Sequence, residues 1–172
     1  MDAIALLKRD HAEVKDMFDQ VEGLGERASA SRAKLFQKID RALELHTKIE
    51  EEIFYPAFKS RAEDSEEREK VLEAFEEHAV AKMLLGELQS LDPGDEKYQA
   101  KLMVLIESVR HHIKEEEGKL FKMARDIFDR EELAQLGEQI ERAKEPGGET
   151  AGRPRTTRTG EVEAPGRRPA RR

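Results

Sequence analysis

The chain has 172 residues, of which 40% are charged, 37% hydrophobic and 5% aromatic, and its formal net charge is −7. It contains no Cys, which excludes thiol catalysis, disulfides, zinc ribbons and iron–sulfur clusters. No apolar run approaches the roughly 20 residues of a membrane span, and residues 1–10 do not have the form of a signal peptide. We therefore expect a cytoplasmic protein without a membrane partner, and the negative charge argues against a nucleic-acid partner.

Apolar residues recur every three or four positions throughout residues 1–144, which is typical of amphipathic helices. Gly23 and Gly25 follow the first periodic segment, and an Asp-Pro-Gly-Asp turn occupies 92–95. The pattern predicts helices over 4–21, 31–59, 65–90, 96–128 and, shorter, 130–144. Four long helices with short connections predict an all-α fold, an antiparallel up-down four-helix bundle with a short C-terminal fifth helix.

The composition changes after residue 144. Residues 145–172 contain seven Arg and four Glu, together with four of the six Pro and five of the eleven Gly. So few apolar residues cannot offset the entropy lost on ordering the chain. The sequence therefore predicts one domain over 1–144 and a disordered tail over 145–172. Its arginines could contact an anionic partner, and the alternative is a solvated tail without a specific partner.

Polar residues interrupt the apolar stripe of each long helix. One histidine stands at a core-facing position of each: His11, His46, His78 and His112. Glu50 and Glu116 each follow a histidine by four residues, so that carboxylate and imidazole share one helix face. A buried carboxylate without a partner is costly, and no core-facing Lys or Arg is placed to neutralise these two. A bound metal ion would neutralise them.

The same residues form an internal repeat. His11 and His78 are 67 residues apart, and the segments that begin with His46 and Glu50 recur 66 residues later. Two copies of a helix pair would face each other across the bundle, related by an approximate two-fold axis. This arrangement suits two metal ions that are bridged by two carboxylates.

These motifs resemble those of the hemerythrin-like family, the HHE cation-binding domain, over roughly residues 1–130. Residues 45–56 (LHTKIEEEIFYP) resemble its helix-2 motif, and 111–121 resemble its helix-4 motif, although Lys122 replaces the usual Pro. The resemblance implies a non-haem di-iron centre with an oxo or hydroxo bridge. One iron would take the first two histidines of the chain and the other iron the next two, and Glu50 and Glu116 would bridge them. Ligand chemistry alone would also suit Mn or Zn.

Other residues near the motifs are interpreted from ideal helix geometry. His111 lies about 100° from the stripe and is expected at the surface. Tyr55 is expected to point away from the site, with a functional phenol as the alternative. Four charged neighbours are expected on solvated faces, with a role beside the metal ligands as the alternative: Lys15, Glu51, Lys82 and Glu117.

Three classes of function stay open. The first is a di-iron protein that reacts with O2, peroxide or nitric oxide, as an oxidoreductase or a protective scavenger. The second is a module that binds or senses oxygen or iron without turnover, and the third is a structural bundle that holds zinc. The family's oxygen carriers have a further histidine four residues from the helix-3 ligand, where this chain has Ala74 and Lys82. We therefore expect catalase- or peroxidase-like chemistry rather than reversible O2 carriage.

Overall fold

The computed structural model of the protein describes residues 1–145, so the tail expected from 145 onward lies outside the described residues apart from Glu145. All regular elements of the described part are helical. In chain order they are α1 (Ala3–Glu22), α2 (Ser29–Ile49), η1 (Glu50–Phe54), α3 (Tyr55–Arg61), α4 (Ser65–Ser90), α5 (Glu96–Glu115), η2 (Glu116–Leu120), α6 (Phe121–Ile127) and α7 (Arg130–Lys144). The predicted all-α class is confirmed.

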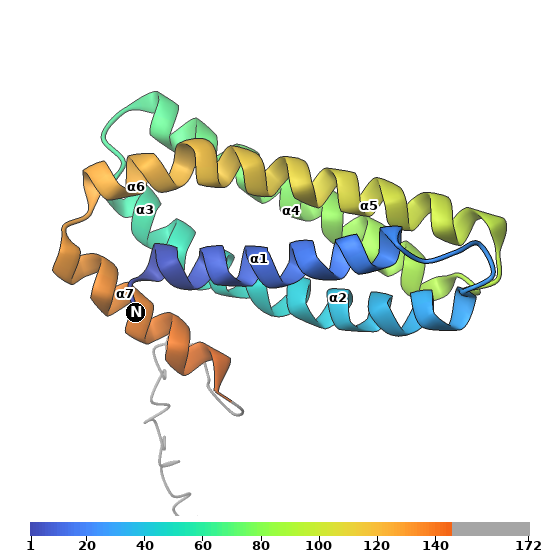
Figure 1. The fold of residues 1–172 in the computed structure, drawn as a ribbon. Coiled ribbons are helices and arrows are strands. Elements are labelled where there is room, and N and C mark those ends of the chain that lie inside the picture. Colours follow the sequence, from blue (N-terminus) through green and yellow to red (C-terminus); the bar gives the residue numbers. More distant parts are fainter. Residues whose placement is uncertain (146–172) are drawn as a thin grey trace, which may run out of the picture.

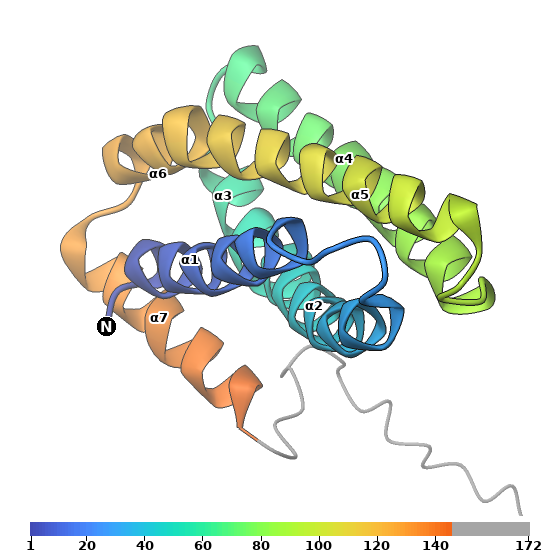
Figure 2. The same ribbon diagram turned by 45° about the vertical axis from the view of Figure 1, so that its right-hand side comes forward.

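The long helices lie side by side as a bundle (Figure 1, Figure 2). α1 packs against α2, and α4 packs against α5; α1 also contacts α5, and α2 contacts α4. Because each pair is joined by a short connection, its two helices run antiparallel. The short helix α7 crosses α1 at the end of the bundle where the chain begins (Figure 2). Within residues 1–145, no helix has the length and apolar character needed to cross a membrane.

Aspartates fix where several helices begin. Asp2, Asp64, Asp95 and Asp129 each precede a helix and accept a hydrogen bond from a backbone N–H group of its first turn. Such caps satisfy donors that have no partner within the helix. At Asp64 and Asp129 a glutamate three residues later bonds back to the cap residue, which completes a capping box. The starts of α1, α4, α5 and α7 are therefore encoded locally.

A polar layer divides the apolar core into two parts. One cluster fills the end of the bundle where α3, α6 and α7 meet the start of α1, and Phe58 belongs to it. The other fills the opposite end, around Phe18. In α1 the first cluster ends at Leu7 and the second begins at Val14, so the buried His11 lies between them. The polar layer is thus covered by apolar side chains on both sides.

Two π-helical turns interrupt the long helices, and each begins at the glutamate of a histidine–glutamate pair. η1 and η2 begin at Glu50 and Glu116, which are repeat equivalents. The sequence predicted unbroken helices over 31–59 and 96–128, which is wrong at these turns. A π turn contains one more residue than an α turn, so the side chains after it are rotated by about 100° from the expected path. The backbone N–H groups of Tyr55 and Phe121 close the turns on the carbonyl oxygens of Glu50 and Glu116.

Gly137 lets α7 lie directly against the N-terminus of the chain. A Cβ atom at this position would overlap the carbonyl oxygen of Met1 and lie 3.1 Å from the backbone nitrogen of Ala3. We expect Gly137→Ala to lower the free energy of unfolding by about 1–3 kcal/mol, the usual cost of overpacking. Gly86→Ala is the matched control, because nothing lies within 4 Å of its added Cβ. Denaturant unfolding that ranks the two variants equally would contradict this close packing.

Candidate metal centre

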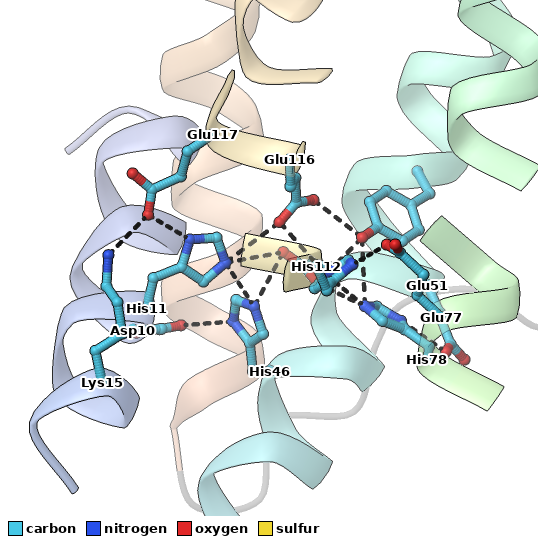
Figure 3. Close-up of polar contacts among 12 residues, drawn as sticks. Asp10, His11, Lys15, His46, Glu51, Glu77, His78, His112, Glu116 and Glu117 are labelled. Carbon is cyan, nitrogen blue, oxygen red and sulfur yellow. Dashed lines mark hydrogen bonds and ion pairs between the residues drawn. The ribbon is translucent and has the colours of Figure 1, made fainter. Parts of the chain in front are cut away.

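Six side chains meet in the polar layer at the middle of the bundle, and Figure 3 shows the polar contacts around them. They are the residues that the sequence predicted as metal ligands: His11, His46, Glu50, His78, His112 and Glu116. None is more than 6% exposed. Their ligand atoms fall into two groups, each within 4.8 Å: His11, His46, Glu50 and Glu116 in one, and Glu50, His78 and His112 in the other. The structure therefore brings all six residues together.

The histidines face one another in pairs. Nε2 of His11 lies 3.0 Å from Nε2 of His46, and the corresponding distance between His78 and His112 is 3.1 Å. The second ring nitrogen, Nδ1, lies beside a carboxylate in every case (Figure 3). These neighbours are Glu117 for His11 at 3.0 Å, Asp10 for His46 at 3.5 Å, Glu51 for His78 at 3.0 Å and Glu77 for His112 at 2.7 Å.

The outer carboxylates prepare the imidazoles to bind a cation. A carboxylate accepts hydrogen bonds, so it favours the tautomer in which Nδ1 carries the proton and Nε2 keeps its lone pair. Two such lone pairs, opposed at about the length of a hydrogen bond, repel each other unless a positive charge lies between them. The donor set therefore fits a metal ion at each pair.

Glu50 and Glu116 reach both histidine pairs. The two oxygens of Glu50 lie 3.1 Å from Nε2 of His46 and 3.2 Å from Nε2 of His78. Oε2 of Glu116 lies 3.2 Å from Nε2 of His11. Oε1 of Glu50 and Oε2 of Glu116 are buried without a hydrogen-bond partner. Buried oxygens of this kind need a partner, and a metal ion would supply one to each.

The outer carboxylates correct the first interpretation of the sequence. Glu51 and Glu117 were expected on solvated faces, but their side chains are only 23% and 27% exposed and each contacts a histidine. Asp10 and Glu77 were not predicted at all. The available signal was their position, because each stands directly before a histidine in equivalent places of the repeat.

Cations lie beside most of these outer carboxylates. Lys15 lies 3.4 Å from Glu117, and its repeat equivalent Lys82 lies 2.6 Å from Glu51. Lys144, at the end of α7, lies 2.5 Å from Asp10. Glu77 instead lies 3.6 Å from His111, whose side chain is 66% exposed. The expected surface position of His111 is confirmed. Each of the two lysines contacts a carboxylate that lies beside a histidine.

Tyr55 points into the centre, so the prediction that it points away is wrong. Its hydroxyl donates to Oε1 of Glu116 at 2.9 Å and lies 3.4 Å from Nε2 of His78. The reason is η1, because a turn of five residues places Tyr55 above Glu50 rather than on the opposite face. The repeat equivalent is Phe121, whose ring stacks on that of His11 with centroids 5.7 Å apart. One half of the centre therefore has a phenol where the other has a phenyl ring.

Protons balance the buried charges in the metal-free protein. Burial alone would lower the pKa of His46, but the carboxylates of Glu50 and Asp10 raise it to about 10. Burial opposes ionisation of Glu50, yet His46 and His78 hold the pKa of Glu50 well below its ordinary value. Burial, with Glu116 and Glu50 nearby, raises the pKa of Tyr55 well above its ordinary value, so its hydroxyl keeps the proton.

Comparison with known proteins agrees with this geometry. The family model of the hemerythrin HHE cation-binding domain matches residues 2–124. The chain belongs to this family. The match to the hemerythrin domain extends from α1 into α6 and contains all six predicted ligands, whereas α7 lies beyond it.

Two relatives of this hemerythrin domain are distant. A protein named DNA nickase from Nostoc sp. is 23% identical over 139 residues, which cover 81% of this chain and 38% of that protein. The chain thus spans less than two-fifths of that relative. The crystal structure of a hemerythrin HHE cation-binding domain-containing protein from Mycobacterium kansasii has a TM-score of 0.70 and 21% identity, covering 82% of this chain and 83% of that one. That likeness shows a shared fold.

A small cavity adjoins the candidate centre of the hemerythrin domain. About 20 Å³ is open to the centre of a water molecule, which is room for one or two small molecules. All four histidines line it, whereas Glu50 and Glu116 do not. The remaining wall is mainly apolar and lies one turn from the histidines, at Val14, Leu43, Ala81 and Val109. Space at the centre is therefore restricted to molecules of a few atoms.

Proposed function

We propose that the protein binds two iron ions with an oxo or hydroxo bridge and reacts with peroxide, O2 or nitric oxide in a redox or protective role. One iron would be held by His11 and His46, the other by His78 and His112, and the two buried glutamates would bridge them. The main support is the close opposition of the Nε2 atoms within each histidine pair, beside two buried carboxylate oxygens that have no hydrogen-bond partner.

The donor set is consistent with iron. Imidazole nitrogens and carboxylate oxygens without sulfur suit Fe, Mn or Zn. Membership of a cation-binding family supports a metal at this place, and the resemblance to di-iron proteins favours iron among the three. The hydroxyl of Tyr55 adds one more oxygen on the side of His78.

The chemistry proposed is a two-electron reaction of a small oxidant. Two bound irons that each change by one electron would supply the two electrons which, with two protons, convert one hydrogen peroxide to two waters. Oxidation of a second hydrogen peroxide to O2 and two protons would return the two electrons. The cavity admits a molecule of this size, and its apolar wall limits access of bulk water. The hydroxyl of Tyr55 holds a proton at Oε1 of Glu116, within the layer that contains the proposed irons.

Two other activities are less well supported. Reversible O2 carriage would need a compensating ligand, because Ala74 and Lys82 occupy the positions where the carriers have a further histidine. DNA nicking, which the name of the Nostoc relative indicates for that protein, is not proposed for this chain. The chain matches only 38% of that protein and has a net charge of −7.

Metal analysis tests the proposal directly. Protein purified from iron-replete medium should contain about two irons per chain and absorb in the near ultraviolet when oxidised, as an oxo bridge does. Added hydrogen peroxide should then be consumed, with O2 evolution measured at an electrode. One metal per chain, or zinc alone, would overturn the di-iron proposal. Two irons without peroxide turnover would favour the binding or sensing module.

Tyr55→Phe should make the two halves of the centre more alike. If the phenol of Tyr55 binds ferric iron, the oxidised protein has a visible phenolate-to-iron absorption that this variant loses. Phe121→Tyr is the reciprocal variant, because Phe121 holds the equivalent place beside His11. Spectra that are identical in wild type and Tyr55→Phe would show that the hydroxyl only donates to Glu116.

A further inference from the structure

Helix α7 lies outside the match to the family and yet ends at the candidate centre. Leu133, Leu136 and Ile140 are buried in the apolar cluster that also contains the first turns of α1. This packing brings Lys144, the last residue of α7, to Asp10 in α1. Its ammonium lies 2.5 Å from both carboxylate oxygens of Asp10. The two side chains are only 18% and 14% exposed.

Asp10 in turn contacts a predicted metal ligand. Its Oδ2 lies 3.5 Å from Nδ1 of His46, the longest of the four contacts between an outer carboxylate and a histidine. A carboxylate held at one side by a contact of this length needs a second partner to keep its orientation. Lys144 provides that partner, and the contact with both oxygens restricts rotation of the carboxylate.

The repeat does not supply this cation. Lys15 and Lys82 are repeat equivalents and lie beside Glu117 and Glu51. Asp10 and Glu77 are also repeat equivalents, but the partner of Asp10 comes from α7 and has no counterpart in the two helix pairs of the described chain. The His46 side of the centre thus depends on a helix that the repeat does not contain.

We propose that Lys144 is a positioning residue, through which α7 fixes the orientation of His46 by holding Asp10 against its Nδ1 atom. The inference rests on the proposed metal site, because it assigns a role in preparing one ligand of that site. An outer carboxylate of a ligating histidine sets the ring orientation and the tautomer, and its loss typically weakens metal binding about 10–100-fold. Lys144 acts one contact further out and never touches the metal.

The first experiment measures iron(II) affinity without oxygen, by competition with a chelator. Lys144→Met keeps the length of the side chain and removes its charge. It should lower the affinity for one of the two irons by about tenfold. Lys144→Arg should restore the affinity, since it can again contact both oxygens of Asp10. Arg142→Met is the matched control in the same helix turn, because the ion pair of Arg142 within residues 1–145 is with the exposed Glu138. It should bind iron as the wild type does.

A double-mutant cycle separates positioning from simple docking of α7. Lys144→Met should lower the iron affinity in the wild-type background. In an Asp10→Asn background it should lower the affinity hardly further, because both changes interrupt the same series of contacts from Lys144 through Asp10 to His46. An equal cost in both backgrounds would contradict the proposal, as would a Lys144→Met protein that binds both irons normally.

A readout on the metal-free protein is independent of the proposed function. The ¹⁵N resonances of His46 should shift in Lys144→Met, whereas those of His78, which pairs with Glu51, should not. Unchanged His46 resonances would overturn the role of Lys144 even if iron binds. If the His46 resonances shift in Lys144→Met but the wild-type protein does not bind two irons, the result would contradict the di-iron proposal instead.

Discussion

Glu50→Ala should abolish binding of both irons, and Glu116→Ala should have a comparable effect. The two oxygens of Glu50 face different histidine pairs, at 3.1 Å from His46 and 3.2 Å from His78, so one truncation would remove a proposed ligand from each proposed metal position. The affinity should fall by more than about 100-fold, the upper end of the effect of losing an outer carboxylate. Metal content after dialysis and chelator competition measure the loss.

The adjacent Glu52 provides the control, because it belongs to the same acidic run and is exposed. Glu52→Ala should retain both irons and the optical spectrum of the wild type. Glu50→Gln is a second variant that keeps the volume of the side chain, so it separates loss of the carboxylate from a packing defect. A Glu50→Gln protein that still holds two irons would mean that the buried glutamates balance charge without ligating the metal.

The six candidate ligands could be predicted because their positions follow the helical period. His46 and Glu50 are four residues apart and the π turn begins only at Glu50, so the helical period up to that point places them on one face. The repeat then supplies the second half of the centre without knowledge of the fold. Element boundaries were also predictable, because aspartate caps and Gly or Pro breakers act locally.

The residues that sequence reasoning missed depend on irregular backbone or on contacts between helices. Tyr55 was misplaced because a constant helical period was assumed, whereas η1 adds a residue to the turn. Asp10 contacts His46 of the neighbouring helix, and Lys144 reaches Asp10 across 134 residues of chain. Such contacts follow from which helices are adjacent, and a pattern along one helix does not contain this information.

The departures from the repeat show where the two halves differ. The half with His78 has the phenol of Tyr55, whereas the half with His11 has the stacked ring of Phe121. The half with His11 also receives Lys144 from α7. The two proposed metal positions are therefore built from the same repeat but have different surroundings.

The metal-free protein should lose stability as the pH rises from about 6.5 to about 10, whereas the iron-loaded protein should not. The pKa of His46 is raised from 6.5 to about 10 by its carboxylate neighbours, and that of His112 is also raised, against burial, by Glu77 and Glu116. A raised pKa gives stability that is complete below the unfolded value and lost as the pH rises through the folded value. One such proton corresponds to about 1.4 kcal/mol per pH unit in this interval.

Bound iron would remove this dependence, because it would take the place of the proton between the paired rings. In the metal-free protein the lowered pKa of Glu50 acts at the opposite end, since its contribution is present above 4.5 and lost as the pH falls. Stability of the metal-free protein should therefore be greatest between about pH 4.5 and 6.5, and iron affinity should increase at higher pH as the ligands release protons.

Denaturant unfolding at about pH 6 and about pH 9, with and without iron, measures the pH dependence of stability and its removal by iron. His111→Gln should leave the slope unchanged, because His111 is exposed and outside the layer, whereas His46→Gln should reduce it. If the metal-free protein is as stable at the higher pH as at the lower one, protons do not balance Glu50 and Glu116 in the buried layer.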